Sequence, residues 1–125
     1  NCLHEAGVEC DSIGLHNISN SFLLVAEKDL NRIVQFDVSS RTKMALPMRD
    51  PEGPLSLDFD PMADFVYWTT RTIRDNRKGP GIKRARRDGS GEEKVIEQRD
   101  AVAHGLALDH TGENIYWADW RAQTI

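Results

Sequence analysis

Catalysis and metal binding require particular side chains at matched spacings, and this sequence holds few candidates for either. The two cysteines, Cys2 and Cys10, both stand near the N-terminus, and no histidine or cysteine cluster elsewhere has metal-site spacing. No serine stands in the glycine setting of a nucleophile elbow, and no glycine-rich loop has the pattern that cradles a phosphate. The sequence therefore predicts a protein that is not an enzyme and that uses no metal and no cofactor.

Aspartates and histidines are further candidates, the former for calcium binding and the latter for pH sensing. Asp58, Asp60 and Asp109 stand at the ends of expected strands, where they suggest calcium, but their recurrence at matching positions favours turns. His104 and His110 flank one expected strand. Because histidine changes its charge between cell-surface and endosomal pH, both are candidates for pH sensing.

Cationic and aromatic residues supply the candidates for ligand contact. The run from Arg71 to Arg87 holds eight basic residues with only Asp75 against them. A solvated loop is the default interpretation, and the alternative is a site for an acidic ligand or heparan sulfate. Trp120 follows an expected strand at the rim, where it either contacts a partner or packs on the rim itself. The residues proposed for ligand contact are Trp120, Arg71, Arg74, Arg77 and Lys78.

Length and charge limit the remaining classes. The chain has 125 residues, with 16 basic and 20 acidic side chains and a net charge of −4, which fits one small domain. This mild acidity gives no general attraction to nucleic acid or to an anionic membrane, and no apolar stretch is long enough to span a bilayer. The first residue is Asn and no signal-peptide pattern follows, so we expect a processed or excised piece.

The first twenty residues indicate the cellular compartment of the protein. Cys2 and Cys10 form a local disulfide around Gly7, or they are free thiols of an intracellular protein. The segment Asn17-Ile18-Ser19 matches the acceptor for N-glycosylation, which makes Asn17 a candidate site. A cysteine pair together with this acceptor favours an extracellular setting.

A repeat organises the rest of the chain. The segments Ser21–Glu27, Asp64–Thr70 and Glu113–Asp119 align with one another, and Trp68 and Trp117 stand 49 residues apart. A recurrence of this length indicates a propeller or another repeat array.

The match extends to the flanking segments. Pro54–Asp58 matches Gly105–Asp109 upstream, Arg32–Asp37 matches Ile82–Gly91 downstream, and Ile125 begins a third copy of this downstream segment. Each piece is short and β-rich, and turn-forming residues separate the pieces. Four such strands repeated around an axis make a β-propeller.

The aromatic and linking segments resemble a known family. Phe65–Thr70 (FVYWTT), Asn114–Asp119 (NIYWAD) and Ile82–Gly91 (IKRARRDGSG) are similar to the YWTD or class B repeats of the low-density lipoprotein receptor family. The resemblance covers residues 21–125 and implies an all-β fold: a partial, incomplete six-bladed β-propeller of about two and a half blades. Two different loop lengths, Leu57-Asp58 to Tyr67 and Leu108-Asp109 to Tyr116, resemble those that recur in such propellers.

The same resemblance assigns structural roles. Residues 1–20 resemble the end of an EGF-like module and a linker, in which Cys2 and Cys10 pair with each other. The motif aromatics are expected to pack between blades. They are Tyr67, Trp68, Tyr116 and Trp117. Glu27 and Thr70 stand where the family has Asp, so only Asp119 is expected to make the polar contact that locks blades at this position.

The function that the resemblance implies is a non-catalytic, extracellular receptor module. The resemblance further implies an extracellular or lumenal location, as part of the ectodomain of a single-pass membrane glycoprotein active in endocytosis. Its propeller is expected to bind a protein ligand or neighbouring receptor modules, or to release ligand in acid. The remaining propeller blades are further partners, and nucleic acid and direct membrane contact are not expected. The alternative is a matrix or basement-membrane glycoprotein, similar to nidogen, that binds another matrix protein.

Overall fold

The computed structural model describes residues 21–71, 80–97 and 103–125. Six of the residues proposed above as sites lie outside these ranges, and the proposals attached to them stay predictions. They are Cys2, Cys10, Asn17, Arg74, Arg77 and Lys78. Within the described ranges, no helix is long and apolar enough to cross a membrane.

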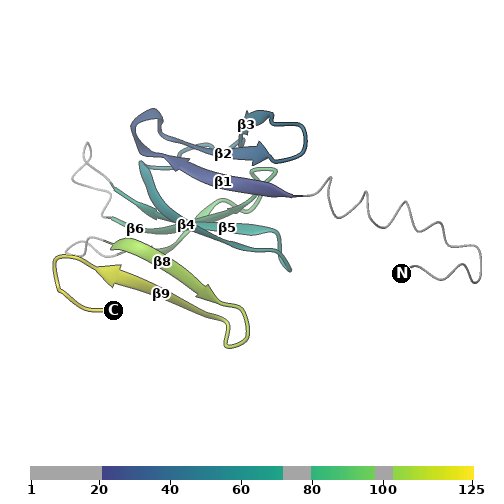
Figure 1. The fold of residues 1–125 in the computed structure, drawn as a ribbon. Helices are drawn as coiled ribbons and strands as arrows, with labels where there is room; N and C mark the ends of the chain where they lie inside the picture. Colours follow the sequence, from purple (N-terminus) through teal and green to yellow (C-terminus); the bar gives the residue numbers. More distant parts are fainter. Residues whose placement is uncertain (1–20, 72–79, 98–102) are drawn as a thin grey trace, which may run out of the picture.

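The described chain is all-β apart from one 3-10 turn, as the sequence predicts. The elements are β1 (Phe22–Glu27), the 3-10 turn Lys28–Leu30, β2 (Arg32–Asp37), β3 (Lys43–Ala45), β4 (Pro54–Asp60), β5 (Phe65–Thr70), β6 (Gly81–Arg86), β7 (Glu93–Glu97), β8 (Ala103–Asp109) and β9 (Asn114–Asp119). They form three antiparallel sheets: sheet A in the order β1-β2-β3, sheet B in the order β4-β5-β6-β7 and sheet C in the order β8-β9. Figure 1 shows the sheets as successive layers, with sheet B in the middle.

Sheets B and C repeat one hairpin. β4 pairs with β5 from Pro54 to Asp60, and β8 pairs with β9 from Ala103 to Asp109, with a register shift near the start of each inner strand. The two hairpins have equal length, so the expectation of two different loop lengths was wrong. Pairing across the strands equates Asp60, and not Asp58, with Asp109.

The shared turn has a clear chemical cause. The carboxylate of Asp60 accepts a hydrogen bond from the backbone N–H of Met62 at 2.9 Å, and that of Asp109 accepts one from the N–H of Gly112 at 3.0 Å. The bonds from Gly112 and from the Asn114 side chain lower the pKa of Asp109, because they stabilise its ionised form. The prediction of turns is therefore confirmed at Asp60 and Asp109 and was wrong for Asp58, which lies within β4.

The main core lies between sheets A and B, because strand alternation turns Val66 and Trp68 toward sheet A. Its buried members are Ile33, Leu46, Val66, Trp68 and Ala85. The Trp68 side chain is fully buried, and its indole Nε1–H donates to the carbonyl of Pro51 at 2.8 Å. The opposite face of β5, which includes Tyr67 and Thr69, turns toward sheet C.

The four motif aromatics are not equally buried. Trp68 is enclosed, Tyr67 and Trp117 are half-buried, and Tyr116 is 52% exposed. Tyr116 alternates onto the face of β9 that points away from sheet B, and none of the described strands covers this face. Packing between blades is therefore confirmed for Trp68, and for Tyr116 it stays a prediction.

The free edge of β9 confirms the third copy of the downstream segment. Thr124 forms an antiparallel bridge with Asp119, just as Gly81 pairs with Thr70 in sheet B. This register makes Ile125 the counterpart of Ile82. In the described residues, the third strand of this sheet amounts to this single bridge.

Glu27 and Thr70 make polar contacts within their own sheets, and the expectation that only Asp119 locks blades together stays a prediction. Glu27 pairs with Lys43 at 2.6 Å and with Arg32, and these partners lower its pKa. The Thr70 hydroxyl accepts a hydrogen bond from the N–H of Gly81 at 3.0 Å. Both contacts join strands of a single sheet, sheet A for Glu27 and sheet B for Thr70.

The arginines at the end of the basic run stack on aromatic rings. The guanidinium of Arg86 lies 4.4 Å from the centre of the Phe65 ring, and that of Arg87 lies 4.5 Å from the Phe22 ring. Arg87 also pairs with Asp64 at 2.6 Å. Arg87 thereby joins β1 to the turn before β5, and Arg86 joins two strands of sheet B.

Candidate protein-binding surface

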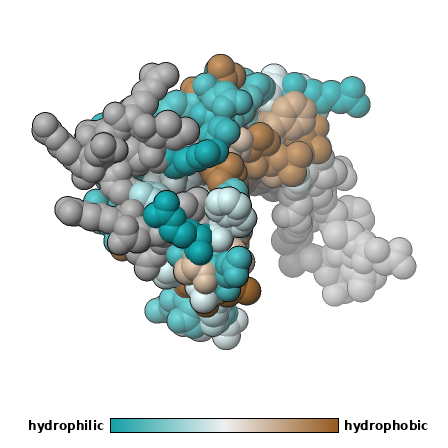
Figure 2. Space-filling view, turned by 90° about the vertical axis from the view of Figure 1, so that its left-hand side faces the viewer, coloured by the Kyte–Doolittle hydropathy of each residue, from teal (hydrophilic) through white to brown (hydrophobic). Residues whose placement is uncertain are grey.

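The two described residues proposed for ligand contact, Arg71 and Trp120, lie at one end of the sheets. Strands β1, β5 and β9 all finish at this end, and the next residue after each strand lies at its rim. Arg71 follows β5 and Trp120 follows β9, so they hold matching positions on neighbouring sheets. Figure 2 looks onto this end, whose described surface is largely hydrophilic, with hydrophobic residues gathered at the upper right.

Trp120 is the most prominent aromatic side chain on this end, with 73% of its surface exposed. The turn that carries it is fixed by Asp119, whose carboxylate accepts hydrogen bonds from the N–H groups of Arg121 at 2.9 Å and Ala122 at 3.1 Å. The Trp120 ring lies 6.1 Å from the ring of His104, tilted by 54°. A large aromatic surface is thus held in place before any partner binds, which lowers the entropic cost of association.

Arg71 belongs to a set of linked loops. Its backbone N–H donates to the carbonyls of Glu52 at 3.0 Å and Gly53 at 3.2 Å, and the N–H of Gly53 donates to the Asn31 side chain at 2.7 Å. Gly53 has a φ of +65°, and a Cβ there would lie 2.9 Å from the Arg71 carbonyl oxygen. Three loops are therefore joined by backbone contacts that a larger residue at position 53 would disturb.

A buried charged cluster lies beneath these loops, and it was not predicted from the sequence. Glu52 pairs with Lys94 at 2.7 Å and lies 3.9 Å from the ammonium of Lys83. Lys83 also donates to the carbonyl of Asp50 and lies 5.9 Å from the Trp68 ring. The cluster fixes the segment that leads into β4. The sequence alone gives little indication of this cluster, because the inward orientation of Lys83 in β6 can be recognised only once the strand register is known.

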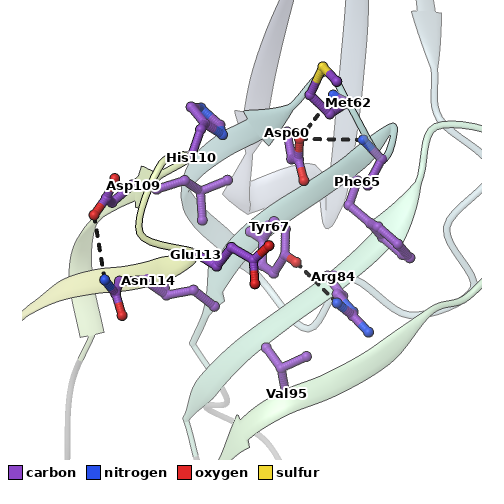
Figure 3. Close-up of a pocket in the computed structure, with 13 residues that line it drawn as sticks. Asp60, Met62, Phe65, Tyr67, Arg84, Val95, Asp109, His110, Glu113 and Asn114 are labelled. Carbon is purple, nitrogen blue, oxygen red and sulfur yellow. Dashed lines mark hydrogen bonds between the residues drawn. The ribbon is translucent and has the colours of Figure 1, made fainter.

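The two histidines do not share a site. His104 lies beside Trp120, whereas His110 follows the opposite end of β8 and lines an open groove between sheets B and C (Figure 3). The groove measures about 690 Å³. On its sheet B wall, Arg84 donates to the Tyr67 hydroxyl at 3.1 Å and pairs with Glu93. Hydrogen bonding to Tyr67 is the main cause that raises the pKa of Arg84.

The end surface and the groove present side chains that are suited to contacts with another molecule. Among the described residues, no three His, Cys, Asp or Glu side chains converge in a way that would hold a metal ion. Asp60 and Asp109 are used in turns, and Glu93 is used in an ion pair. What the end surface offers a ligand is an exposed indole, neighbouring cations and a rigid set of loops.

Antiparallel sheets stacked as layers, with a Tyr-Trp pair recurring in the second strand, define a β-propeller of the YWTD type. Low-density lipoprotein receptor-related protein 5 from mouse and from human is 33% identical over 93 residues, covering 74% of this chain and 5% of theirs. Low-density lipoprotein receptor-related protein 4 from human is 32% identical over 90 residues, covering 72% of this chain and 4% of its own. The chain thus spans about a twentieth of the length of these relatives.

A solved structure agrees with this assignment. A chain in the crystal structure of the nidogen/laminin complex superposes with a TM-score of 0.64 at 28% identity, covering 80% of this chain and 37% of that one. No protein-family model matches the sequence. The chain belongs to the YWTD-repeat β-propellers, and its sequence is similar to those of the low-density lipoprotein receptor-related proteins.

Proposed function

We propose that this chain is a non-catalytic, extracellular protein-binding module of a receptor, and that it binds its ligand at the end surface around Trp120. The observation that carries the proposal is the 73% exposure of an indole on a turn fixed by Asp119. Binding hot spots are enriched in tryptophan and arginine, because both combine a large contact area with polar groups. Arg71 lies at the matching position of the neighbouring sheet.

The relatives support a protein partner. Those with the greatest sequence similarity reported above are named as receptor-related proteins, and the matched solved structure is a complex of nidogen with laminin. The nidogen match also favours the second candidate function, a matrix glycoprotein that binds another matrix protein. A membrane-spanning helix with a cytoplasmic sorting motif, encoded downstream in the same reading frame, would select the receptor.

Photo-crosslinking from position 120 tests the binding surface directly. A benzoylphenylalanine at Trp120 is expected to yield discrete protein adducts on cells and matrix, competed by unlabelled wild-type chain and about tenfold less well by Trp120→Ala, since an anchor contributes 1 kcal/mol or more. The matched control places the same probe at Met62, which is 92% exposed in the turn between β4 and β5 at the opposite end of the sheets. Equal adducts from both positions, or equal competition by Trp120→Ala, would contradict the proposal.

Release of ligand in acid is the finer proposal, and His104 would carry it. A protonated imidazole beside Trp120 is costly to bury in an interface unless it finds an acceptor. Asp119, which pairs with Ala103 across sheet C, already binds two backbone N–H groups, and Arg121 is cationic. We expect adduct yield to fall at endosomal pH in the wild type and to persist in His104→Phe. His110→Phe, altered at the other end of β8, is the control and should behave as wild type.

A further inference from the structure

Two side chains of sheet B bond directly to the backbone of β8 in sheet C. The Asp58 carboxylate accepts a hydrogen bond from the N–H of Leu108 at 2.8 Å. The Thr69 hydroxyl lies 3.4 Å from the carbonyl oxygen of His104, to which it donates. The two contacts hold β8 near its two ends, and neither depends on pairing within a sheet.

Thr69 lies where the inner strand is irregular. Its side chain is fully buried, and its oxygen accepts a hydrogen bond from the N–H of Ser56 at 3.1 Å, within the register shift of β4. Two carbonyl oxygens lie within reach of its single hydroxyl proton, that of His104 at 3.4 Å and that of Ser56 at 3.5 Å. One hydroxyl therefore satisfies the irregular part of sheet B and reaches the neighbouring sheet.

Among the described residues, these contacts occur at the junction between sheets B and C and not at the junction between sheets A and B. By strand pairing, the counterpart of Thr69 is Ala118 in β9 and Ala26 in β1, and the counterpart of Asp58 is Ala107 in β8. An alanine side chain forms no hydrogen bond. Of the copies in this chain, only the one in sheet B therefore supplies these side chains.

Polar contacts matter here because the apolar packing between sheets B and C is open. The groove of about 690 Å³ lies between the two sheets, and Leu106 and Leu108 are only half-buried. By contrast, the junction between sheets A and B encloses Trp68 and Ile33 completely. The position of β8 therefore depends more on directional bonds than the position of sheet A does.

We propose that Thr69 and Asp58 are positioning residues that hold β8, and with it the His104–Trp120 pair, against sheet B. The consequence for ligand binding rests on the function proposed above, whereas the placement of β8 does not. The two parts are measured separately.

Thr69→Val tests the first contact, because valine keeps the shape of threonine and removes only the hydroxyl. We expect hydrogen exchange of β8 and β9 amides to accelerate roughly tenfold, the effect of one lost hydrogen bond on local opening. Thr70→Val is the matched control: Thr70 is as deeply buried, but its hydroxyl bonds to Gly81 inside sheet B. It should leave β8 and β9 exchange unchanged, and Thr69→Ser should restore wild-type exchange.

Asp58→Ala tests the second contact even if Thr69→Val does not fold. The Leu108 amide is expected to exchange at least about tenfold faster, because hydrogen bonds to charged groups are the stronger ones, and Asp58→Asn should recover part of the protection. Unchanged β8 exchange in both Thr69→Val and Asp58→Ala would overturn the proposal. So would an equal change in Thr70→Val.

The crosslinking probe at position 120 measures the effect on the surface. Lower adduct yield in Asp58→Ala, with the Thr70→Val yield unchanged, supports the link from β8 to Trp120. Faster β8 exchange with undiminished adducts would show that the surface is positioned by other contacts, which overturns that part. If wild type forms no adducts, the proposed function fails, and hydrogen exchange still decides whether β8 is held by these residues.

Discussion

Trp68→Ala is expected to lower the free energy of unfolding by about 3 to 5 kcal/mol, the range for removing a large aromatic side chain from a core. The side chain is fully buried against Ile33, Leu46 and Val66, and its indole N–H binds the Pro51 carbonyl. The substitution leaves both a cavity between sheets A and B and an unpaired carbonyl oxygen. Urea unfolding followed by circular dichroism measures the change.

Trp120→Ala is the matched control, since it removes the same side chain from an exposed turn. Its unfolding free energy should stay within about 0.5 kcal/mol of wild type. If the two variants unfolded at the same urea concentration, Trp68 would not form the core that joins sheets A and B.

Glu52→Gln should have the second large effect, lowering the unfolding free energy by about 3 to 5 kcal/mol. Only 10% of the Glu52 side chain, 8% of the Lys83 side chain and 17% of the Lys94 side chain are exposed. The amide keeps the size of the carboxylate but removes the negative charge, so two buried ammonium groups lose a counter-ion. Burial makes this loss costly because little water is present to replace the carboxylate.

A double variant and an exposed pair make this prediction specific. Glu52→Gln combined with Lys83→Met should be less destabilised than the sum of the single changes, because one uncompensated charge is removed. Glu93→Gln breaks the pair with Arg84, whose partners are 32% and 53% exposed, and should cost less than about 1 kcal/mol. A loss of similar size in Glu52→Gln and Glu93→Gln would contradict the role of burial.

The recurrence of aromatic segments was enough to predict the two matching hairpins. A spacing of 49 residues between Trp68 and Trp117 places two copies of one hairpin, and the observed pairing of β4 with β5 and β8 with β9 follows it. Strand alternation and turn-forming aspartates are local properties, because they depend on residues two to five positions apart. For that reason, the turns at Asp60 and Asp109 could be identified from the chain alone.

Contacts between sheets depend on a register that the sequence leaves open. Matching Asp58 with Asp109 by sequence displaced the inner strands by two residues, which keeps the same sides inward and so conserves the hydrophobic pattern. Only the observed register shows that Asp58 binds the N–H of Leu108 while Asp60 makes the turn.

The sequence by itself determined the fold class, the repeat and the rim position of Trp120, because periodicity and turn chemistry depend on neighbouring residues. The tertiary structure alone decided which side of each strand meets another sheet. It buried Trp68 and left Tyr116 exposed, although both belong to one motif. It also joined Glu52 to Lys83 and Thr69 to His104. The physical reason is that burial and hydrogen bonding depend on which sheet lies opposite a side chain, and that neighbour is distant in the sequence.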